Sequence, residues 1–352
     1  MEDNYLKGRG SQFNPKNKFL KGERVLEHIE GIDEEITSDV TTQYLEDTPK
    51  KIVNEVTSPD VGMMYSLNPY QGCEHGCIYC YARNAHEYWG FSAGLDFERK
   101  IIVKKNAPEL LKKLFESKKW EVNPISLSGN TDCYQPAERK FKITRQLLEV
   151  ALEYRHPIAM ITKNALILRD KDILQEMAKL RLIKVFVSIT SLNPELRRTM
   201  EPRTVTAEQR LKVIETLASV GVPMGVMTAP IIPGLNDHEI PKLIEAAANH
   251  GALGAGYTIV RLNGAVGAIF KDWIHKNFPD RAERVLHLIE SCHGGKLNDS
   301  RWGTRTRGEG NIADVVNQVF KLAVRKHFAN RSFPAYDKSL FRRRSPQQQQ
   351  LF

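Results

Sequence analysis

The sequence predicts an α/β fold built from repeated strand–helix units. Short β-branched or apolar runs, bounded by turn residues, alternate about six times with segments of helical period. This alternation is typical of parallel βα units, which assemble into either a barrel or an open doubly wound sheet. Hydrophobic residues make up 41% of the 352 residues and charged residues 26%, as in ordinary globular proteins, so disorder as the main state is excluded.

Each expected strand is short and apolar enough for burial. The six strands fall at residues 63–70, 124–130, 157–164, 182–190, 223–231 and 254–262. Helices are expected between them at residues 108–117, 140–154, 171–180, 207–220 and 239–249, and afterwards at 270–277, 281–292 and 312–328. The pattern divides the chain into an irregular N-terminal extension (1–60), the strand–helix domain (61–262), a helical C-terminal extension (263–335) and a flexible basic, Gln-rich tail (336–352).

The sequence indicates a cytoplasmic protein with no membrane segment. Its most apolar stretch, residues 220–234, contains three prolines and three glycines and predicts a buried strand. The first ten residues, MEDNYLKGRG, have neither the apolar core of a signal peptide nor the Arg-rich, acid-poor composition of a transit peptide. Five cysteines are a small, odd number, which disfavours a disulfide framework and favours metal or thiol chemistry.

The positive charge is concentrated at the C-terminal end. The net charge is +9, and the segment from Arg301 to Phe352 carries eleven Lys or Arg against three Asp or Glu. This excess indicates a surface for an anionic partner, DNA or RNA. The last five residues, from Gln348 to Phe352, resemble the Gln-x-x-Leu-Phe peptides that bind bacterial sliding clamps, which gives a second hypothetical partner. An inert glutamine tail is the alternative.

Three cysteines form an array in one short loop. Cys73, Cys77 and Cys80 lie in NPYQGCEHGCIYCYAR with the spacing Cys-x3-Cys-x2-Cys, just after the first expected strand. Thiolate-rich sets of this kind suit iron–sulfur clusters or zinc. Closed structural sites use four ligands, so a triad leaves a metal with an open position. His75, inside the same loop, is the candidate fourth ligand of the zinc alternative.

This array, with Tyr79 directly before the third cysteine, resembles the radical SAM superfamily. The segments NPYQGC, CIYCYAR, TDCYQPAE, ITK and APIIPGLND are similar to its spore-photoproduct-lyase-like branch. The resemblance covers residues 63–262 and implies a partial TIM-type (βα)6 barrel. It also implies that Cys73, Cys77 and Cys80 hold a 4Fe-4S cluster, that its open iron binds S-adenosyl-L-methionine (SAM), and that an external one-electron donor supplies the electron for reductive cleavage to a 5'-deoxyadenosyl radical.

The resemblance also assigns the residues that bind the cofactor. They are Tyr79 beside the adenine, then Ser128, Gly129, Asn130, Lys163 and Ser188 at the ends of successive strands. The residue types alone leave other interpretations open. The segment from Ser128 to Asn130 also fits an ordinary βα turn, Lys163 a surface lysine, and Ser188 a serine that satisfies backbone partners.

The two remaining cysteines have different predicted roles. Cys133 follows the second expected strand, and the resemblance implies that its thiol donates a hydrogen atom to a substrate radical, although the motif around it differs from that of spore photoproduct lyase. A buried small hydrophobe is the alternative for Cys133. Cys292 continues an apolar stripe at helical spacing and is expected in the core.

These observations together predict a radical SAM enzyme that acts on a nucleic acid, by DNA lesion repair or base modification. Two alternatives stay open: radical chemistry on a small metabolite or protein side chain, and a nucleic-acid-binding protein whose cluster is not catalytic. The segment HGGK (293–296) with Arg301, Arg305 and Arg307 predicts either a phosphate-binding loop or a glycine-rich surface connection.

Overall fold

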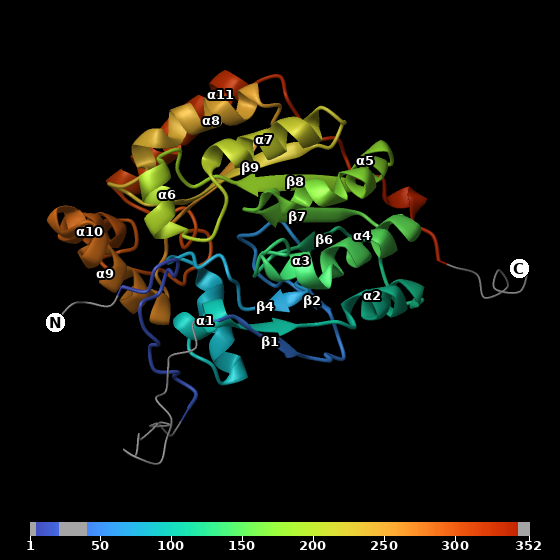
Figure 1. Cartoon of the computed structure of the whole chain (residues 1–352). Coiled ribbons are helices and arrows are strands. Elements are labelled where there is room, and N and C mark those ends of the chain that lie inside the picture. Colours follow the sequence, from blue (N-terminus) through green and yellow to red (C-terminus); the bar gives the residue numbers. More distant parts are fainter. Residues whose placement is uncertain (1–4, 21–40, 344–352) are drawn as a thin grey trace, which may run out of the picture.

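The core of the protein is one seven-stranded, mainly parallel β-sheet (Figure 1). The structure is a computed structural model that describes residues 5–20 and 41–343. The strands lie in the order β10-β9-β8-β7-β6-β3-β2, and every neighbouring pair from β10 to β3 is parallel, while β2 is antiparallel to β3. Their bounds are β2 Val53–Glu55, β3 Tyr65–Leu67, β6 Ile125–Leu127, β7 Ile158–Thr162, β8 Ile183–Ser188, β9 Met224–Ile231 and β10 Ala255–Ile259. The predicted α/β class and all six expected strands are confirmed.

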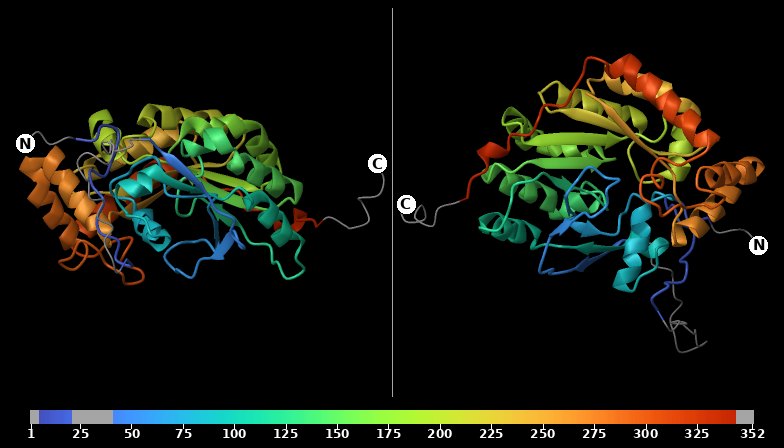
Figure 2. Two further views of the ribbon diagram at one scale, coloured as in Figure 1. Left: turned by 60° about the horizontal axis from the view of Figure 1, so that its bottom comes forward. Right: turned by 180° about the vertical axis from the view of Figure 1, so that it is seen from behind.

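Helices that follow the strands form a layer along the sheet (Figure 2). They are α2 Ala107–Glu116, α3 Ala137–Phe141, α4 Ile143–Glu153, α5 Lys171–Lys179, α7 Ala207–Ala218 and α8 Ile240–Asn249. Helix α8 shows why they pack: its buried residues Ile240, Leu243, Ile244 and Ala247 recur at helical spacing and face the sheet. No helix in the described part of the chain has both the length and the apolar character that a bilayer crossing requires.

The other side of the sheet faces a cavity. Strand β7 alternates buried residues with half-buried Ala159 and Ile161, although the sequence predicted full burial. Ile161 lines the cavity, and so do Met227 and Ala229 of β9. The alternation follows because one face of each strand packs under the helices while the other face borders an open space.

After β10 the helices α9, α10 and α11 follow, and the first two of them support the site. Helices α9 Ala265–Asn277 and α10 Ala282–Ser291 share a second hydrophobic core with Ile78 and Tyr79 of the cysteine loop. Helix α6 Pro194–Met200 joins the same core, and Trp273 Nε1 donates a hydrogen bond to the Thr199 carbonyl at 3.0 Å. Helix α11 Asn311–Phe328 packs on α8.

The C-terminal arm, residues 329–343, packs against the main sheet. In the view from behind, the arm runs from α11 past the amino ends of the main-sheet strands (Figure 2). Phe333 stacks on Phe186 of β8 with ring centroids 5.3 Å apart, and the Arg342 amide donates to the Tyr154 carbonyl at 3.1 Å. The flexible tail predicted from residue 336 is therefore wrong for residues 336–343, whose apolar and backbone partners lie far away in sequence.

The N-terminal region also contains structure that the sequence analysis missed. Strand β1 Gln43–Glu46 pairs in parallel with β5 Lys100–Val103, and β4 Tyr70–Gln71 pairs antiparallel with β5. Strand β2 joins the main sheet. The prediction of an irregular extension over residues 1–60 is thus wrong for these two segments, while the remaining domain boundaries stay predictions.

An N-terminal strap, residues 5–15, lies over the cysteine loop. The amides of Gly10 and Ser11 donate to the carboxylate of Glu98 at 3.1 and 2.8 Å. Glu98 follows the loop on the short helix α1 Leu95–Arg99 and is fully buried. A Cβ on Gly10 would lie 1.7 Å from the carbonyl oxygen of Gly76, so only glycine allows this backbone approach.

We predict that Gly10→Ala destabilises the protein by about 1–3 kcal/mol, because the strap must move off the cysteine loop to accommodate the methyl group. Urea unfolding of the purified full-length protein measures the free energy, and limited trypsin digestion reports release of the strap. Gly62→Ala is the matched control, since nothing lies within 4 Å of a Cβ built there. Equal stability of the two variants would contradict this packing.

Candidate active site

The cysteine loop is held by a buried ion pair. Arg83 lies in the 3-10 helix η1 Tyr81–Trp89 that follows the loop, and its guanidinium lies 2.6 Å from the Glu98 carboxylate, with both side chains fully buried. The Arg83 Nε donates to the Cys77 carbonyl at 2.9 Å. The Cys73 amide donates to the Phe97 carbonyl at 2.9 Å. These contacts fix the loop backbone at Cys73 and at Cys77.

The three thiols are free and largely buried. Cys73 and Cys77 are each 7% exposed, and Cys80 is half-buried. Burial raises the pKa of all three thiols, that of Cys77 to about 12. The thiolate forms therefore need a nearby positive charge, which a bound metal supplies. This thiol set, with no fourth cysteine in the loop, fits an iron–sulfur cluster with an open position.

His75, the candidate fourth ligand for zinc, already has polar partners. Among the described residues, no three His, Cys, Asp or Glu side chains are arranged to hold a single metal ion. Both ring nitrogens of His75 already face polar partners: Nε2 lies 3.2 Å from the Asn164 amide and Nδ1 lies 3.4 Å from the Asp132 carboxylate. A polynuclear cluster places each thiolate on a different iron, so it does not require the compact arrangement of a single-ion site.

A cavity of about 430 Å³ opens at the carboxyl ends of the strands, beside the cysteine loop. The structure brings two of the three cysteines and all six candidate SAM-binding residues to its wall: Cys77, Cys80, Tyr79, Ser128, Gly129, Asn130, Lys163 and Ser188. Cys73 lies behind, packed with Phe97 and Ala82. In a parallel sheet the carboxyl ends of successive strands meet at one edge, which explains this convergence.

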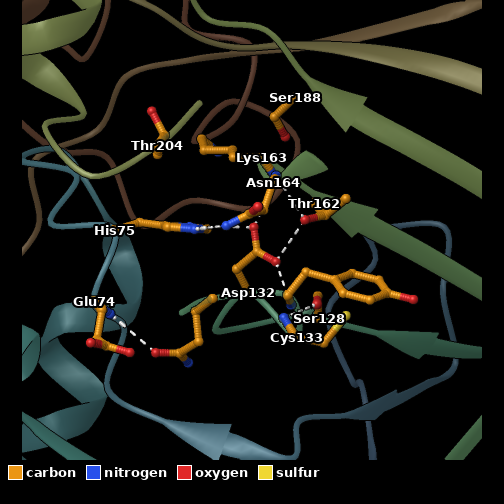
Figure 3. Close-up of polar contacts among 12 residues, drawn as sticks. Glu74, His75, Ser128, Asp132, Cys133, Thr162, Lys163, Asn164, Ser188 and Thr204 are labelled. Carbon is orange, nitrogen blue, oxygen red and sulfur yellow. Dashed lines mark hydrogen bonds and ion pairs between the residues drawn. The ribbon is translucent and has the colours of Figure 1, made fainter. Parts of the chain in front are cut away.

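Asp132 connects the turn after β6, the end of β7 and the cysteine loop (Figure 3). The sequence analysis did not identify this residue. Its carboxylate accepts hydrogen bonds from the Thr162 hydroxyl at 2.8 Å and from the Lys163 amide at 2.7 Å, both at the end of β7. The same carboxylate faces His75 of the cysteine loop. Asp132 therefore fixes the backbone of Lys163, whose ammonium makes no hydrogen bond or ion pair with a described residue and is available to a ligand in the cavity.

The turn after β6 has its own internal contacts. Ser128 adopts a left-handed conformation, with φ of 73°, and its hydroxyl accepts a hydrogen bond from the Cys133 amide at 2.7 Å. The Gly129 carbonyl accepts one from the Tyr81 hydroxyl, and the Asn130 amide donates to Asn68 Oδ1 at 2.8 Å. The Ser128 hydroxyl thus shapes the turn and also borders the cavity.

A second buried ion pair holds Tyr79. Arg210 of α7 lies 2.5 Å from Glu201, and both side chains are essentially unexposed. Glu201 accepts hydrogen bonds from the Tyr79 hydroxyl and, at 2.6 Å, from the Thr190 hydroxyl. Arg210 also donates to the Ser188 carbonyl at 2.9 Å. Burial by itself would raise the pKa of Glu201, but the charges of Arg210 and Lys163 and the hydrogen bonds lower it to about 2.

Cys133 lies in the hydrophobic core, in agreement with the alternative of a buried hydrophobe. Its side chain has no exposed surface and is absent from the cavity wall. Hydrogen donation to a substrate radical requires direct contact, which this position does not provide. The donor role predicted for Cys133 would therefore require the segment after β6 to move. Cys292 is also fully buried in the core, as predicted.

Part of the predicted basic segment makes contacts within the molecule. Arg331 donates to the Ala248 carbonyl in the last turn of α8 and to the Ala252 carbonyl just after it, both at 2.7 Å, and Arg343 donates to the Trp120 carbonyl at 2.9 Å. Arg301 pairs with Asp299 at 2.8 Å. The clamp-binding hypothesis for Gln348 to Phe352 lies outside the described residues.

Comparison with known proteins identifies the family. Residues 67–247 match the family model described as "Radical SAM superfamily". The chain belongs to the radical SAM superfamily. An uncharacterized protein of Mycobacterium tuberculosis is 31% identical over 240 residues, covering 68% of this chain and 70% of the relative. One of Methanocaldococcus jannaschii is 30% identical over 237 residues, covering 67% of this chain and 84% of the relative.

Solved structures support the radical SAM fold. Spore photoproduct lyase in complex with dinucleoside spore photoproduct superimposes with a TM-score of 0.59 at 15% identity, covering 86% of this chain and 85% of that chain. A mutant of the same lyase with bound AdoMet and the dinucleoside gives a TM-score of 0.60 at 15% identity, covering 81% and 79%. At this identity the likeness establishes a shared fold, and the predicted likeness to the spore-photoproduct-lyase branch is confirmed at that level.

We predict that Glu201→Gln destabilises the protein by about 3–5 kcal/mol at pH 7, because it leaves the buried Arg210 charge uncompensated. The pKa of Glu201 is about 2, below its ordinary value of 4.5. The carboxylate therefore contributes its full stabilisation above pH 4.5 and loses it as the pH falls toward 2. Urea unfolding of both proteins over this range measures the difference.

Glu208→Gln on the exposed side of α7 is the control, since Glu208 makes no ion pair in the described structure. A gap between the wild type and Glu201→Gln that stayed constant from pH 7 to pH 3 would contradict the assigned role of the ion pair.

Proposed function

We propose that the protein is a radical SAM enzyme that acts on a nucleic acid. One observation carries the enzyme assignment: Cys77 and Cys80 open onto the same cavity as Tyr79 and the free ammonium of Lys163. Thiols that only anchor a structural cluster need no such space. A cavity of about 430 Å³ next to an open-position cluster is suited to a cofactor and a reacting group.

In this proposal Cys73, Cys77 and Cys80 would hold a 4Fe-4S cluster. When bound and reduced by an external one-electron donor, the cluster would supply the electron that cleaves SAM to methionine and a 5'-deoxyadenosyl radical. The low exposure of Cys73 and Cys77 supports this role, because burial limits access of water and oxygen to a reactive centre.

The side chains of the cavity would orient SAM. The Lys163 ammonium would attract the SAM carboxylate, and the turn that contains Gly129 would receive the SAM amino group. Tyr79, fixed by Glu201, would provide a rigid ring for the adenine. Apolar wall residues such as Ile161, Met227 and Val260 exclude water from the reacting atoms.

The nucleic-acid substrate is supported by cationic residues at the cavity. Arg261 lines it in addition to Lys163, and the whole chain carries a net charge of +9. Cationic walls attract phosphate groups and raise their local concentration. DNA lesion repair and base modification both fit these features.

The central experiment is anaerobic reconstitution of the full-length protein with iron and sulfide, followed by reduction and addition of SAM. We expect the wild type to release 5'-deoxyadenosine, measured by liquid chromatography and mass spectrometry. Cys77→Ala should abolish the product by removing one cluster ligand. Cys292→Ala, which changes a core cysteine far along the chain, is the control.

A wild-type protein that assembles a cluster and binds nucleic acid, yet forms no 5'-deoxyadenosine, would refute the enzyme assignment. It would favour the alternative of a nucleic-acid-binding protein with a non-catalytic cluster.

A further inference from the structure

The loop of residues 299–309 forms part of the cavity wall but has no role in the proposed SAM chemistry. Two of its residues, Arg305 and Thr306, line the cavity. The Ile259 amide at the end of β10 donates to the Thr306 carbonyl at 2.9 Å. Arg307 donates to the Tyr257 carbonyl of β10 at 3.2 Å and stacks on the ring of Tyr257. The loop is therefore anchored to the last strand, at the edge where the cavity opens.

Trp302 is the exposed aromatic residue of this loop. Its side chain is 56% exposed, and the Arg305 guanidinium lies 4.2 Å from the ring centroid. Arg305 is itself held by an ion pair with the buried Asp60 and a hydrogen bond to Ser58. The Gly303 amide donates to the same Asp60 carboxylate at 2.6 Å. The indole is thus fixed from one side while more than half of its surface remains open, as in a stacking platform.

Arg261 is the free cation next to this platform. It follows β10 and lines the cavity, and its side chain makes no hydrogen bond or ion pair with a described residue. The other arginines here are occupied: Arg305 by Asp60, Arg301 by Asp299 and Arg307 by Tyr257. Burial and then repulsion by Arg305 lower the pKa of Arg261. A bound anion would offset both effects.

We propose that Trp302 and Arg261 recognise the substrate, and that the substrate is an unpaired nucleotide whose base stacks on Trp302 and whose phosphate binds Arg261. The inference rests on the proposed function, since it specifies the nucleic acid. Trp302 packs on Arg305, and Arg305 lines the same cavity as Arg261, so the geometry allows one ligand to contact both side chains. A planar guanidinium matches two phosphate oxygens.

Stacking on Trp302 selects single-stranded or extruded nucleotides. A base inside a duplex already has neighbours on both faces, so it must leave the stack before it can cover the indole. Only such an extruded base would also reach a cavity of about 430 Å³ that contains the cofactor-binding residues.

The test uses the full-length reconstituted protein and fluorescein-labelled oligothymidine or oligouridine single strands, with the matching duplexes for comparison. Fluorescence anisotropy measures the dissociation constants over a range of salt concentrations. We expect single strands to bind more tightly than duplexes. Trp302→Ala should weaken single-strand binding about fivefold or more, because it removes one stacked base, while Trp302→Phe should restore most of the affinity.

Arg261→Gln should weaken binding and reduce the slope of log K against log salt by about 0.7, the value for one phosphate contact to a single strand. Trp89→Ala and Arg284→Gln are matched controls, because both residues are exposed and neither lines the cavity. Circular dichroism melting of each variant checks that it is folded, and the phenylalanine variant keeps the test valid if the alanine variant unfolds.

Variants that bind both single strands as tightly as the controls would overturn the inference, and so would a wild type that binds neither strand or prefers the duplex. This outcome differs from failure of the proposed function. Formation of 5'-deoxyadenosine by the wild type is measured without oligonucleotide, so a SAM-cleaving enzyme that ignores nucleic acid is recognised as such.

Discussion

The buried ion pair between Arg83 and Glu98 is the interaction on which the site depends. Neither side chain has any exposed surface, so each charge relies on the other and on its hydrogen bonds. Arg83 binds the carbonyl of Cys77 and those of Ala93 and Gly94. Glu98 binds the amides of the N-terminal strap. This ion pair therefore holds the cysteine loop through Arg83 and holds the N-terminal strap over the loop through Glu98.

The charged side chains in and around the cavity fall into two groups, those with hydrogen-bond or ion-pair partners and those without. The carboxylates of Asp132 and Glu201 are saturated by hydrogen bonds from strand ends and, for Glu201, by Arg210. Asp132 lines the cavity, and so do Lys163 and Arg261, whose side chains have no such partners in the described structure. The site is thus prepared for anionic groups at two places, near the cysteines and near the loop of residues 299–309. This arrangement supports a cofactor carboxylate at one place and a substrate phosphate at the other.

The sequence predicted what depends on local pattern. The six strands and most helices follow from alternating apolar runs and helical periodicity, and the cysteine loop from the spacing of Cys73, Cys77 and Cys80. The convergence of Lys163 and Ser188 on one cavity follows from strand order in a parallel sheet.

The parts that the sequence did not predict depend on distant partners. Glu201 meets Tyr79 across 122 positions, and Gly10 meets Glu98 across 88, so no local signal marks either contact. Asp132 precedes Cys133 in TDCYQPAE, and the sequence analysis assigned a function only to Cys133. The structure places Asp132 at the cavity and Cys133 in the core. A buried carboxylate becomes recognisable only when its hydrogen-bond donors are known.

The most direct measurement of the central claim is electron paramagnetic resonance of the anaerobically reconstituted, reduced protein with and without SAM. The account predicts the signal of a reduced 4Fe-4S cluster whose g-values change when SAM is added, because SAM would bind the iron that lacks a protein ligand. A cluster signal that SAM leaves unchanged, or no such signal in a protein with all three cysteines intact, would contradict it.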